Sequence, residues 1–438
     1  MESLPNRFKS AEFPEALSLN ARYRATRALS LQLVETLNEA DAAVQSMPDA
    51  SPAKWHLAHT TWFFETFLLR DHVAGYRRHD ERWPFLFNSY YEAEGARVAR
   101  ADRGLLTRPT LAEVIDYRRR VDDALLAALP ALEQTHGDLV ELGIQHEQQH
   151  QELLLTDIKH LFAANPLGPV YRLPEATTRA ITPPLRWIAG REGRIEAGHE
   201  GPGFAFDNEL PRHSTWLAPH ALASRTVTNG EWIEFMRDGG YATPSLWLSD
   251  GLDWVRRETV AAPLYWREGD GGWEQFTLAG WQPVQPDDPV CHVSFYEADA
   301  FAAWAGCRLP TEQEWEAAAQ DHDPDGGNQL DRANPAMPYP AMPYPAVPCA
   351  VGSTDSDSFA ALFGDVWEWT GSAYRPWPGY QTAPGAVGEY NGKFMSGQFV
   401  LKGGSCATPR GHMRASYRNF FHPHQRWQFT GLRLARSL

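Results

Sequence analysis

Apolar residues recur at helical spacing through the N-terminal third of the chain. In residues 22–44 they return every three or four positions, and the same spacing marks residues 55–69, 110–129 and 139–162. Thr110 is the expected N-cap of the third stretch. Four amphipathic stretches with modest connections predict four helices that pack as an up-and-down bundle.

Residues 163–184 interrupt this pattern. The segment contains five prolines and one glycine and has no sustained periodicity, which is typical of a connection between domains. We therefore expect an N-terminal domain in residues 1–165, a linker in residues 166–185 and a C-terminal domain in residues 186–438.

Beyond the linker, short apolar runs alternate with Gly, Pro, Asp and Asn. Only residues 296–305 and 312–319 have a helical pattern. This texture predicts an irregular α+β domain with few strands and long loops. Residues 336–345 repeat AMPYP twice, which predicts an extended surface loop.

Composition narrows the class of protein. The chain has 438 residues, 43% hydrophobic and 22% charged, as expected of a globular protein with more than one domain. Its net charge of −15 argues against nucleic acid as a partner. No segment approaches the ~18 consecutive apolar residues of a membrane span.

Four cysteines without a CxxC pair, and no secretory signal, predict a cytoplasmic protein with reduced thiols. The oligomeric state stays open.

The strongest chemical signal is QHEQQHQE, at residues 145–152. His146 and His150 are four residues apart, so on a helix both imidazoles project from one face and suit a single metal ion. The alternative is an exposed polar face that happens to carry two histidines. Leucines at 139, 142 and 153 share this face and favour an inward orientation.

A third ligand is available on the second predicted helix, which carries His56 and His59. One of them facing the core would complete a three-histidine site with positions left for water, O2 or substrate. The spacing does not choose between iron and zinc. The string also fits the HExxH pattern of zinc hydrolases, with Glu147 as general base. Tyr90 and Tyr91, on the next loop, are candidate acids if they lie near a metal.

Taken together, the motifs resemble the ergothioneine-biosynthesis sulfoxide synthases over nearly the whole chain. The motifs are LAH, HEQQH, RLPTEQEWEAAA (308–319), GDVWEWT (364–370), LKGGS (401–405) and TGLRLAR (430–436). The resemblance implies a multidomain α and α+β fold. A DinB-like four-helix bundle carrying the metal ligands would precede a C-type-lectin-like domain of the formylglycine-generating-enzyme, or sulfatase-modifying, type.

The resemblance also implies a chemistry. Family members hold a mononuclear non-haem iron(II) with three histidines, which by motif are His59, His146 and His150 here. They use O2 to join a thiol to C2 of the imidazole of hercynine and to oxidise the sulfur to a sulfoxide. Gln149 and Asn419 match family residues at the hercynine head, where aromatic faces such as that of Phe420 suit a quaternary ammonium.

The sulfur donor stays open between cysteine and γ-glutamylcysteine. Members that use γ-glutamylcysteine carry an aspartate where this chain has Phe421. NSYYEA and GEYNGKFMSGQ resemble the cysteine-using subgroup, in which tyrosines at positions 90 and 91 are placed as proton donors. Arg97 and Arg103 are candidates for binding the donor carboxylate. The alternatives are a selenoneine synthase acting on a selenosugar, a zinc hydrolase and a non-catalytic binding module.

Overall fold

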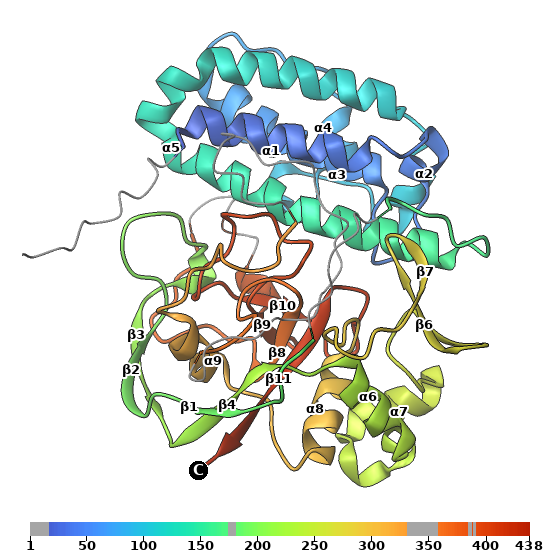
Figure 1. Ribbon diagram of the computed structural model, residues 1–438. Coiled ribbons are helices and arrows are strands. Elements are labelled where there is room, and N and C mark those ends of the chain that lie inside the picture. Colours follow the sequence, from blue (N-terminus) through green and yellow to red (C-terminus); the bar gives the residue numbers. More distant parts are fainter. Residues whose placement is uncertain (1–16, 174–180, 331–357, 384–387, 389–390) are drawn as a thin grey trace, which may run out of the picture.

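The computed structural model describes residues 17–173, 181–330, 358–383, 388 and 391–438. It consists of a helical domain stacked on a domain of sheets and helices (Figure 1). The AMPYP repeat and Cys349 lie outside the described residues. The other three cysteines, Cys291, Cys307 and Cys406, are free thiols.

The helical domain has helices in the chain order α1 (Leu19–Val34), α2 (Glu39–Ala43), α3 (Ala53–Phe64), α4 (Trp83–Phe87) and α5 (Leu111–Ala164). A π-helical segment, Glu65–Arg70, continues α3. The prediction of one helix over residues 22–44 was wrong, because α1 ends at Val34 and Asn38 starts a new helix. The Asn38 side chain accepts hydrogen bonds from the amides of Ala40 and Asp41, which stabilises this second start.

The third and fourth predicted helices are the two arms of α5. The backbone bends at His136, where φ is −141°, and the two arms run antiparallel (Figure 1). The bundle of α1, α3 and these two arms confirms the predicted fold of the N-terminal part. Thr110 caps α5 as expected, with its hydroxyl accepting from the amide of Glu113.

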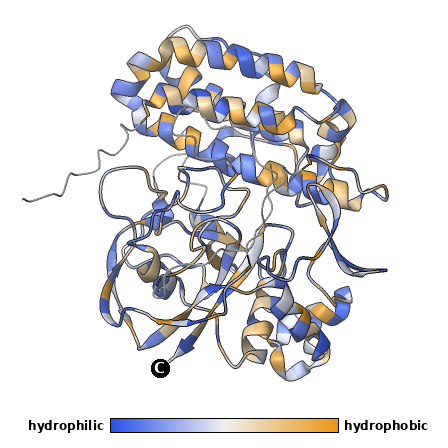
Figure 2. Ribbon diagram, in the orientation of Figure 1, coloured by the Kyte–Doolittle hydropathy of each residue, from blue (hydrophilic) through white to orange (hydrophobic). Residues whose placement is uncertain are grey.

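The second arm of α5 lies between α3 and the C-terminal domain. Gly143 allows a close approach to α3, because a Cβ atom there would lie 2.4 Å from Cε1 of Phe64. Figure 2 shows a hydrophilic stretch in this arm, beside the C-terminal domain. The QHEQQHQE motif therefore faces both α3 and the C-terminal domain.

The C-terminal domain is built on a six-stranded sheet in the order β1-β4-β11-β8-β9-β10. Neighbouring strands are antiparallel except β11 and β8, which are parallel. The strands are β1 (Trp187–Ala189), β4 (His220–Thr226), β8 (Trp367–Ala373), β9 (Phe399–Lys402), β10 (Asn419–Phe421) and β11 (Thr430–Ser437). The edge strand β10 carries the three predicted residues at 419–421.

Smaller elements surround this sheet. They are the hairpin β2 (Gly193–Ala197) and β3 (His213–Leu217), the three-stranded sheet β5 (Trp266–Gly269), β6 (Gly272–Thr277) and β7 (Gly280–Pro283), and helices α6 (Asn229–Arg237), α7 (Ser249–Glu258), α8 (Phe295–Trp304) and α9 (Glu312–Ala319). Helices α8 and α9 confirm the two predicted helices, but the expectations that only these two segments are helical and that the domain has few strands were wrong. A capping box at Thr228 and Glu231 was an available signal for α6.

Candidate metal centre

Three histidines from two helices converge at the centre of the molecule. His59 comes from α3, and His146 and His150 come from the second arm of α5. One ring nitrogen from each lies within 4.8 Å of the others. The ring centroids are 4.7–5.0 Å apart. This convergence requires the packing of α3 against α5, and it suits a single metal ion.

The hydrogen bonding of the histidine rings leaves ring nitrogens available to a metal ion. Nδ1 of His59 is 2.6 Å from the carbonyl oxygen of Phe87, so it donates there and Nε2 keeps its lone pair. Nδ1 of His146 is buried and has no hydrogen-bond partner among the described residues. An imidazole buried with an unsatisfied nitrogen is costly unless a ligand compensates, and a metal ion would do so.

Burial also favours the neutral imidazoles that metals bind. It lowers the pKa of His59 and His150 well below the usual value, and the neighbouring histidines add to this effect. It lowers the pKa of His146 to about 4. Neutral rings at neutral pH are the protonation state required of metal ligands. The residues present therefore fit a metal ion.

A cavity of about 340 Å³ opens from this centre toward the C-terminal domain. It is lined by the expected metal ligands, the two tyrosines and the residues expected to bind hercynine or the sulfur donor, namely His59, His146, His150, Tyr90, Tyr91, Gln149, Asn419, Phe420 and Phe421. Residues of both domains thus meet in one space of a size that accommodates small molecules.

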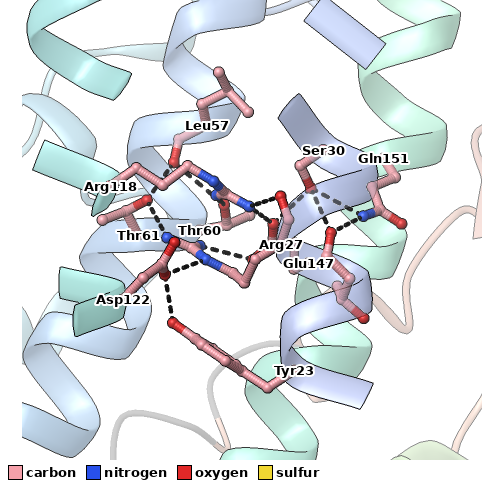
Figure 3. A network of polar contacts seen from close by, with 11 residues as sticks. Tyr23, Arg27, Ser30, Leu57, Thr60, Thr61, Arg118, Asp122, Glu147 and Gln151 are labelled. Atoms are coloured by element: carbon pink, nitrogen blue, oxygen red, sulfur yellow. Dashed lines mark hydrogen bonds and ion pairs between the residues drawn. The ribbon is translucent and has the colours of Figure 1, made fainter. Parts of the chain in front are cut away.

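Glu147 points away from this cavity. Its carboxylate pairs with Arg27 at 2.8 Å and with Arg118, and it accepts from the Ser30 hydroxyl at 2.5 Å (Figure 3). Burial alone would raise the pKa of the Glu147 carboxyl, but Arg118 and Arg27 lower it to about 2. A carboxylate engaged in this way cannot reach a substrate as a general base, so the geometry does not support a zinc hydrolase.

Two further residues of α5, Gln149 and Glu152, face the C-terminal domain. Glu152 accepts hydrogen bonds from Nε1 of Trp367, from Ser405 and from Thr408, each at 2.7 Å. Gln149 donates from Nε2 to the hydroxyl of Tyr417 at 2.7 Å. These bonds attach the C-terminal domain to the helix that carries two of the histidines.

Comparison with known proteins agrees with both halves of this architecture. Residues 22–154 match the DinB superfamily, and residues 173–438 match the sulfatase-modifying factor enzyme 1-like domain. The hercynine oxygenase of Mycobacterium tuberculosis is 34% identical over 426 residues, covering 93% of this chain and 96% of that protein. The chain belongs to the hercynine oxygenase family. Its member from Mycolicibacterium smegmatis is 35% identical over 431 residues, covering 93% and 96%.

A solved structure, PvdO from Pseudomonas aeruginosa, superposes with a TM-score of 0.38 and 19% identity, covering 57% of this chain and 94% of that one. A likeness this weak says nothing about the site. Among the described residues, no helix is long and apolar enough to cross a membrane.

The two candidate acids, Tyr90 and Tyr91, occupy different environments at the cavity. The hydroxyl of Tyr90 accepts from Arg100 at 3.1 Å, and its ring packs edge-on against Phe394. Tyr91 is buried among Trp62, Phe63 and Phe67. Both tyrosines line the cavity and are candidate acids.

Asn419, Phe420 and Phe421 bring strand β10 to the opposite side of the cavity. The Phe420 ring stacks on Tyr374 with centroids 4.1 Å apart and planes 11° apart. The side-chain oxygen of Asn419 accepts from the Phe420 amide at 2.9 Å, which holds the asparagine close to its own strand. An aromatic face and an amide dipole thus lie side by side.

Arg103 lies on the cavity wall as a buried cation. Its guanidinium donates to the hydroxyls of Ser51 and Ser89 and lies 3.4 Å above the ring of Trp55. Among the described residues, no carboxylate lies within ion-pair distance of it. Burial, with Arg100 nearby, lowers the pKa of Arg103 to about 9. Arg97 instead pairs with Glu92 at 2.7 Å and does not line the cavity.

Sequence reasoning missed several residues that line the cavity. Arg100, Tyr417 and Asp157 were not singled out, and helical spacing did not distinguish His56 from His59, which only the family resemblance assigned as a ligand. The signal for Asp157 was its position seven residues after His150, which places both on one face of a helix. Arg100 begins a short 3-10 helix, Arg100–Leu105, and Tyr417 lies on a loop, so helical spacing along the chain predicts no face that they share with the histidines.

Proposed function

We propose that this protein is a non-haem iron(II), O2-dependent sulfoxide synthase that joins the sulfur of cysteine to C2 of the imidazole of hercynine. The observation that carries the proposal is the convergence of His59, His146 and His150 beside a cavity large enough for two small substrates. The similarity to two hercynine oxygenases over 93% of the chain supports hercynine as one substrate.

Three neutral imidazoles leave open coordination positions and fit iron(II) as well as other borderline metals. Bound iron(II) would supply the redox chemistry that lets a thiol, an imidazole C–H and O2 react. Forming the C–S bond and oxidising the sulfur each release two electrons. One oxygen atom of O2 enters the sulfoxide and the other leaves as water, so no further reductant is needed.

Hercynine would be held by the wall that Gln149 and strand β10 form. A trimethylammonium group has no proton to donate, so it is bound by aromatic faces and by oxygen dipoles. Phe420 offers a face already oriented by its stacking on Tyr374, and Asn419 lies beside it. Gln149 adds a buried Oε1 atom that has no partner among the described residues.

The carboxylate of cysteine would bind Arg103, with Arg100 beside it. A buried guanidinium that donates hydrogen bonds only to hydroxyls, with an aromatic face beside it, is incompletely compensated, and a substrate carboxylate would supply the missing charge. Cysteine bound there would lie near Trp55, which stacks on the ring of His59 with centroids 4.6 Å apart. The thiol would then be directed toward the three histidines.

Tyr90 and Tyr91 would act as proton donors to the reacting oxygen. The hydrogen bond from Arg100 to the Tyr90 hydroxyl orients this phenol. Tyr91 is held by aromatic packing in the bundle and lines the cavity.

The test is an aerobic assay of protein loaded with iron(II) under anaerobic conditions. Hercynine is supplied with cysteine, γ-glutamylcysteine or a selenosugar in parallel, and products are identified by mass spectrometry. We expect the sulfoxide conjugate of hercynine and cysteine, with one O2 consumed per product. Zinc-loaded protein and His146→Ala are the controls. Product formation only with γ-glutamylcysteine or the selenosugar would overturn the choice of donor. Equal activity with zinc would overturn the oxygenase chemistry.

A further inference from the structure

A fourth histidine, His56, lies directly behind His150. Nδ1 of His56 is 2.9 Å from Nδ1 of His150, and Nε2 of His56 is 2.9 Å from Oδ2 of Asp157. The same carboxylate oxygen accepts from the backbone amide of Ser51 at 2.7 Å. His56 and Asp157 are both buried.

The order of the groups determines where the protons lie. Asp157 is an acceptor, so Nε2 of His56 carries a proton and donates it. In a neutral His56, Nδ1 is then an acceptor, and the proton between the two rings belongs to Nδ1 of His150. His150 is thereby held in the tautomer whose Nε2 atom is bare and available to the three-histidine centre.

His56 is not itself a fourth ligand of this centre. Both of its nitrogens are engaged, one by His150 and one by Asp157, and the group that could hold a metal contains only His59, His146 and His150. The three rings are also supported differently. His59 is backed by a neutral carbonyl, whereas His150 is backed through His56 by a carboxylate.

We propose that His56 and Asp157 are positioning residues that hold His150 in its metal-binding tautomer and strengthen it as a donor. The inference rests on the proposed metal site but not on the substrate or the reaction. A carboxylate behind a metal-binding imidazole orients the ring and raises its basicity, and loss of such a partner weakens metal affinity roughly 10–100-fold. Here the effect passes through a second imidazole.

The test is metal binding by the full-length protein without substrate. Co(II) is titrated against a chromophoric competitor, which gives a dissociation constant, and its visible absorption bands report the ligand geometry. We expect His56→Phe, which keeps an aromatic ring at this position but removes both nitrogens, to weaken Co(II) binding roughly 10–100-fold and to shift the visible absorption bands. His56→Asn can still accept from His150 through Oδ1, so it should lose less affinity than His56→Phe.

Asp157→Asn is the second variant, because it changes the charge with little change in shape. It should also weaken Co(II) binding, and circular dichroism checks that each variant is folded. His160→Asn is the matched control, since His160 is on the same helix but bonds to Ser46 and does not line the cavity. It should bind Co(II) like the unmodified protein.

Two results would overturn the inference. Wild-type affinity and spectrum in Asp157→Asn would show that the carboxylate does not act on His150, even if His56→Phe failed to fold. Unmodified protein that binds no Co(II) would overturn the metal site as well. Failure to make a sulfoxide, with Co(II) binding that depends on His56 and Asp157, would contradict only the proposed reaction.

Discussion

The amide nitrogen of Gln149 donates to the hydroxyl of Tyr417 at 2.7 Å, across the boundary between the bundle and the C-terminal domain. The phenol is in turn 3.2 Å from Nε2 of His412, whose Nδ1 atom is 2.7 Å from Oε1 of Gln145. Gln145 is one helical turn before Gln149, so the chain of bonds returns to α5. This series of hydrogen bonds, which begins and ends on α5, holds the side-chain amide of Gln149 in one orientation. Its Oε1 atom is left for a ligand.

Replacing Tyr417 with Phe should therefore affect binding of hercynine. The change frees the Gln149 amide to rotate, so we expect the KM for hercynine to rise by up to about tenfold, the equivalent of one hydrogen bond. The KM for cysteine should stay within a factor of two or so. Tyr76→Phe is the control, because Tyr76 bonds to Glu65 away from the cavity. An unchanged hercynine KM in Tyr417→Phe would contradict the orienting role.

Arg103→Met should separate substrate binding from stability. Loss of a charge-assisted contact to the cysteine carboxylate is expected to raise the KM for cysteine roughly 10–100-fold. The free energy of unfolding should stay the same or rise, because the variant removes a buried charge that has no carboxylate partner among the described residues.

Arg97→Met is the matched control for this variant. Arg97 is paired with Glu92 outside the cavity, so its replacement should leave the cysteine KM unchanged. Denaturant unfolding and steady-state kinetics measure the two quantities. A larger effect on the cysteine KM in Arg97→Met than in Arg103→Met would contradict the assignment of the carboxylate site.

The double variant Tyr90→Phe, Tyr91→Phe tests the proton donors. Without a phenol at the cavity, thiol oxidation should compete with C–S bond formation, so we expect the product ratio to move from sulfoxide toward cysteine sulfinate. Mass spectrometry of both products measures the ratio. Each single variant shows which hydroxyl acts, and full sulfoxide synthesis by the double variant would exclude both.

Glu147→Gln should act on stability rather than on chemistry. Arg118 has no other carboxylate within ion-pair distance among the described residues, so removing the negative charge leaves it uncompensated in the bundle (Figure 3). We expect a loss of about 3–5 kcal/mol in the free energy of unfolding. The folded fraction should keep sulfoxide synthesis, whereas a hydrolase using Glu147 as base would lose all activity. Glu133→Gln, at an exposed position of α5, should change neither quantity.

Local patterns in the sequence predicted the parts of this protein that depend on neighbouring residues. Helical periodicity placed the bundle, because an amphipathic helix must bury its apolar stripe. The spacing of His146 and His150 put two imidazoles on one face, and the Thr110 cap marked where α5 begins. The α6 helix was missed although its capping box was present, whereas α8 and α9, which are of similar length, were predicted.

Only the tertiary structure decided which polar groups face one another. Residues 146 and 147 are adjacent in the chain, yet a helix turns about 100° per residue, so His146 faces the cavity and Glu147 faces two arginines. Likewise, the sequence placed His56 and His59 on neighbouring directions of one helix. The packing of α3 against α5 then brought His59 to the metal centre and left His56 between His150 and Asp157, because contacts between helices depend on their separation and rotation, which local spacing does not contain.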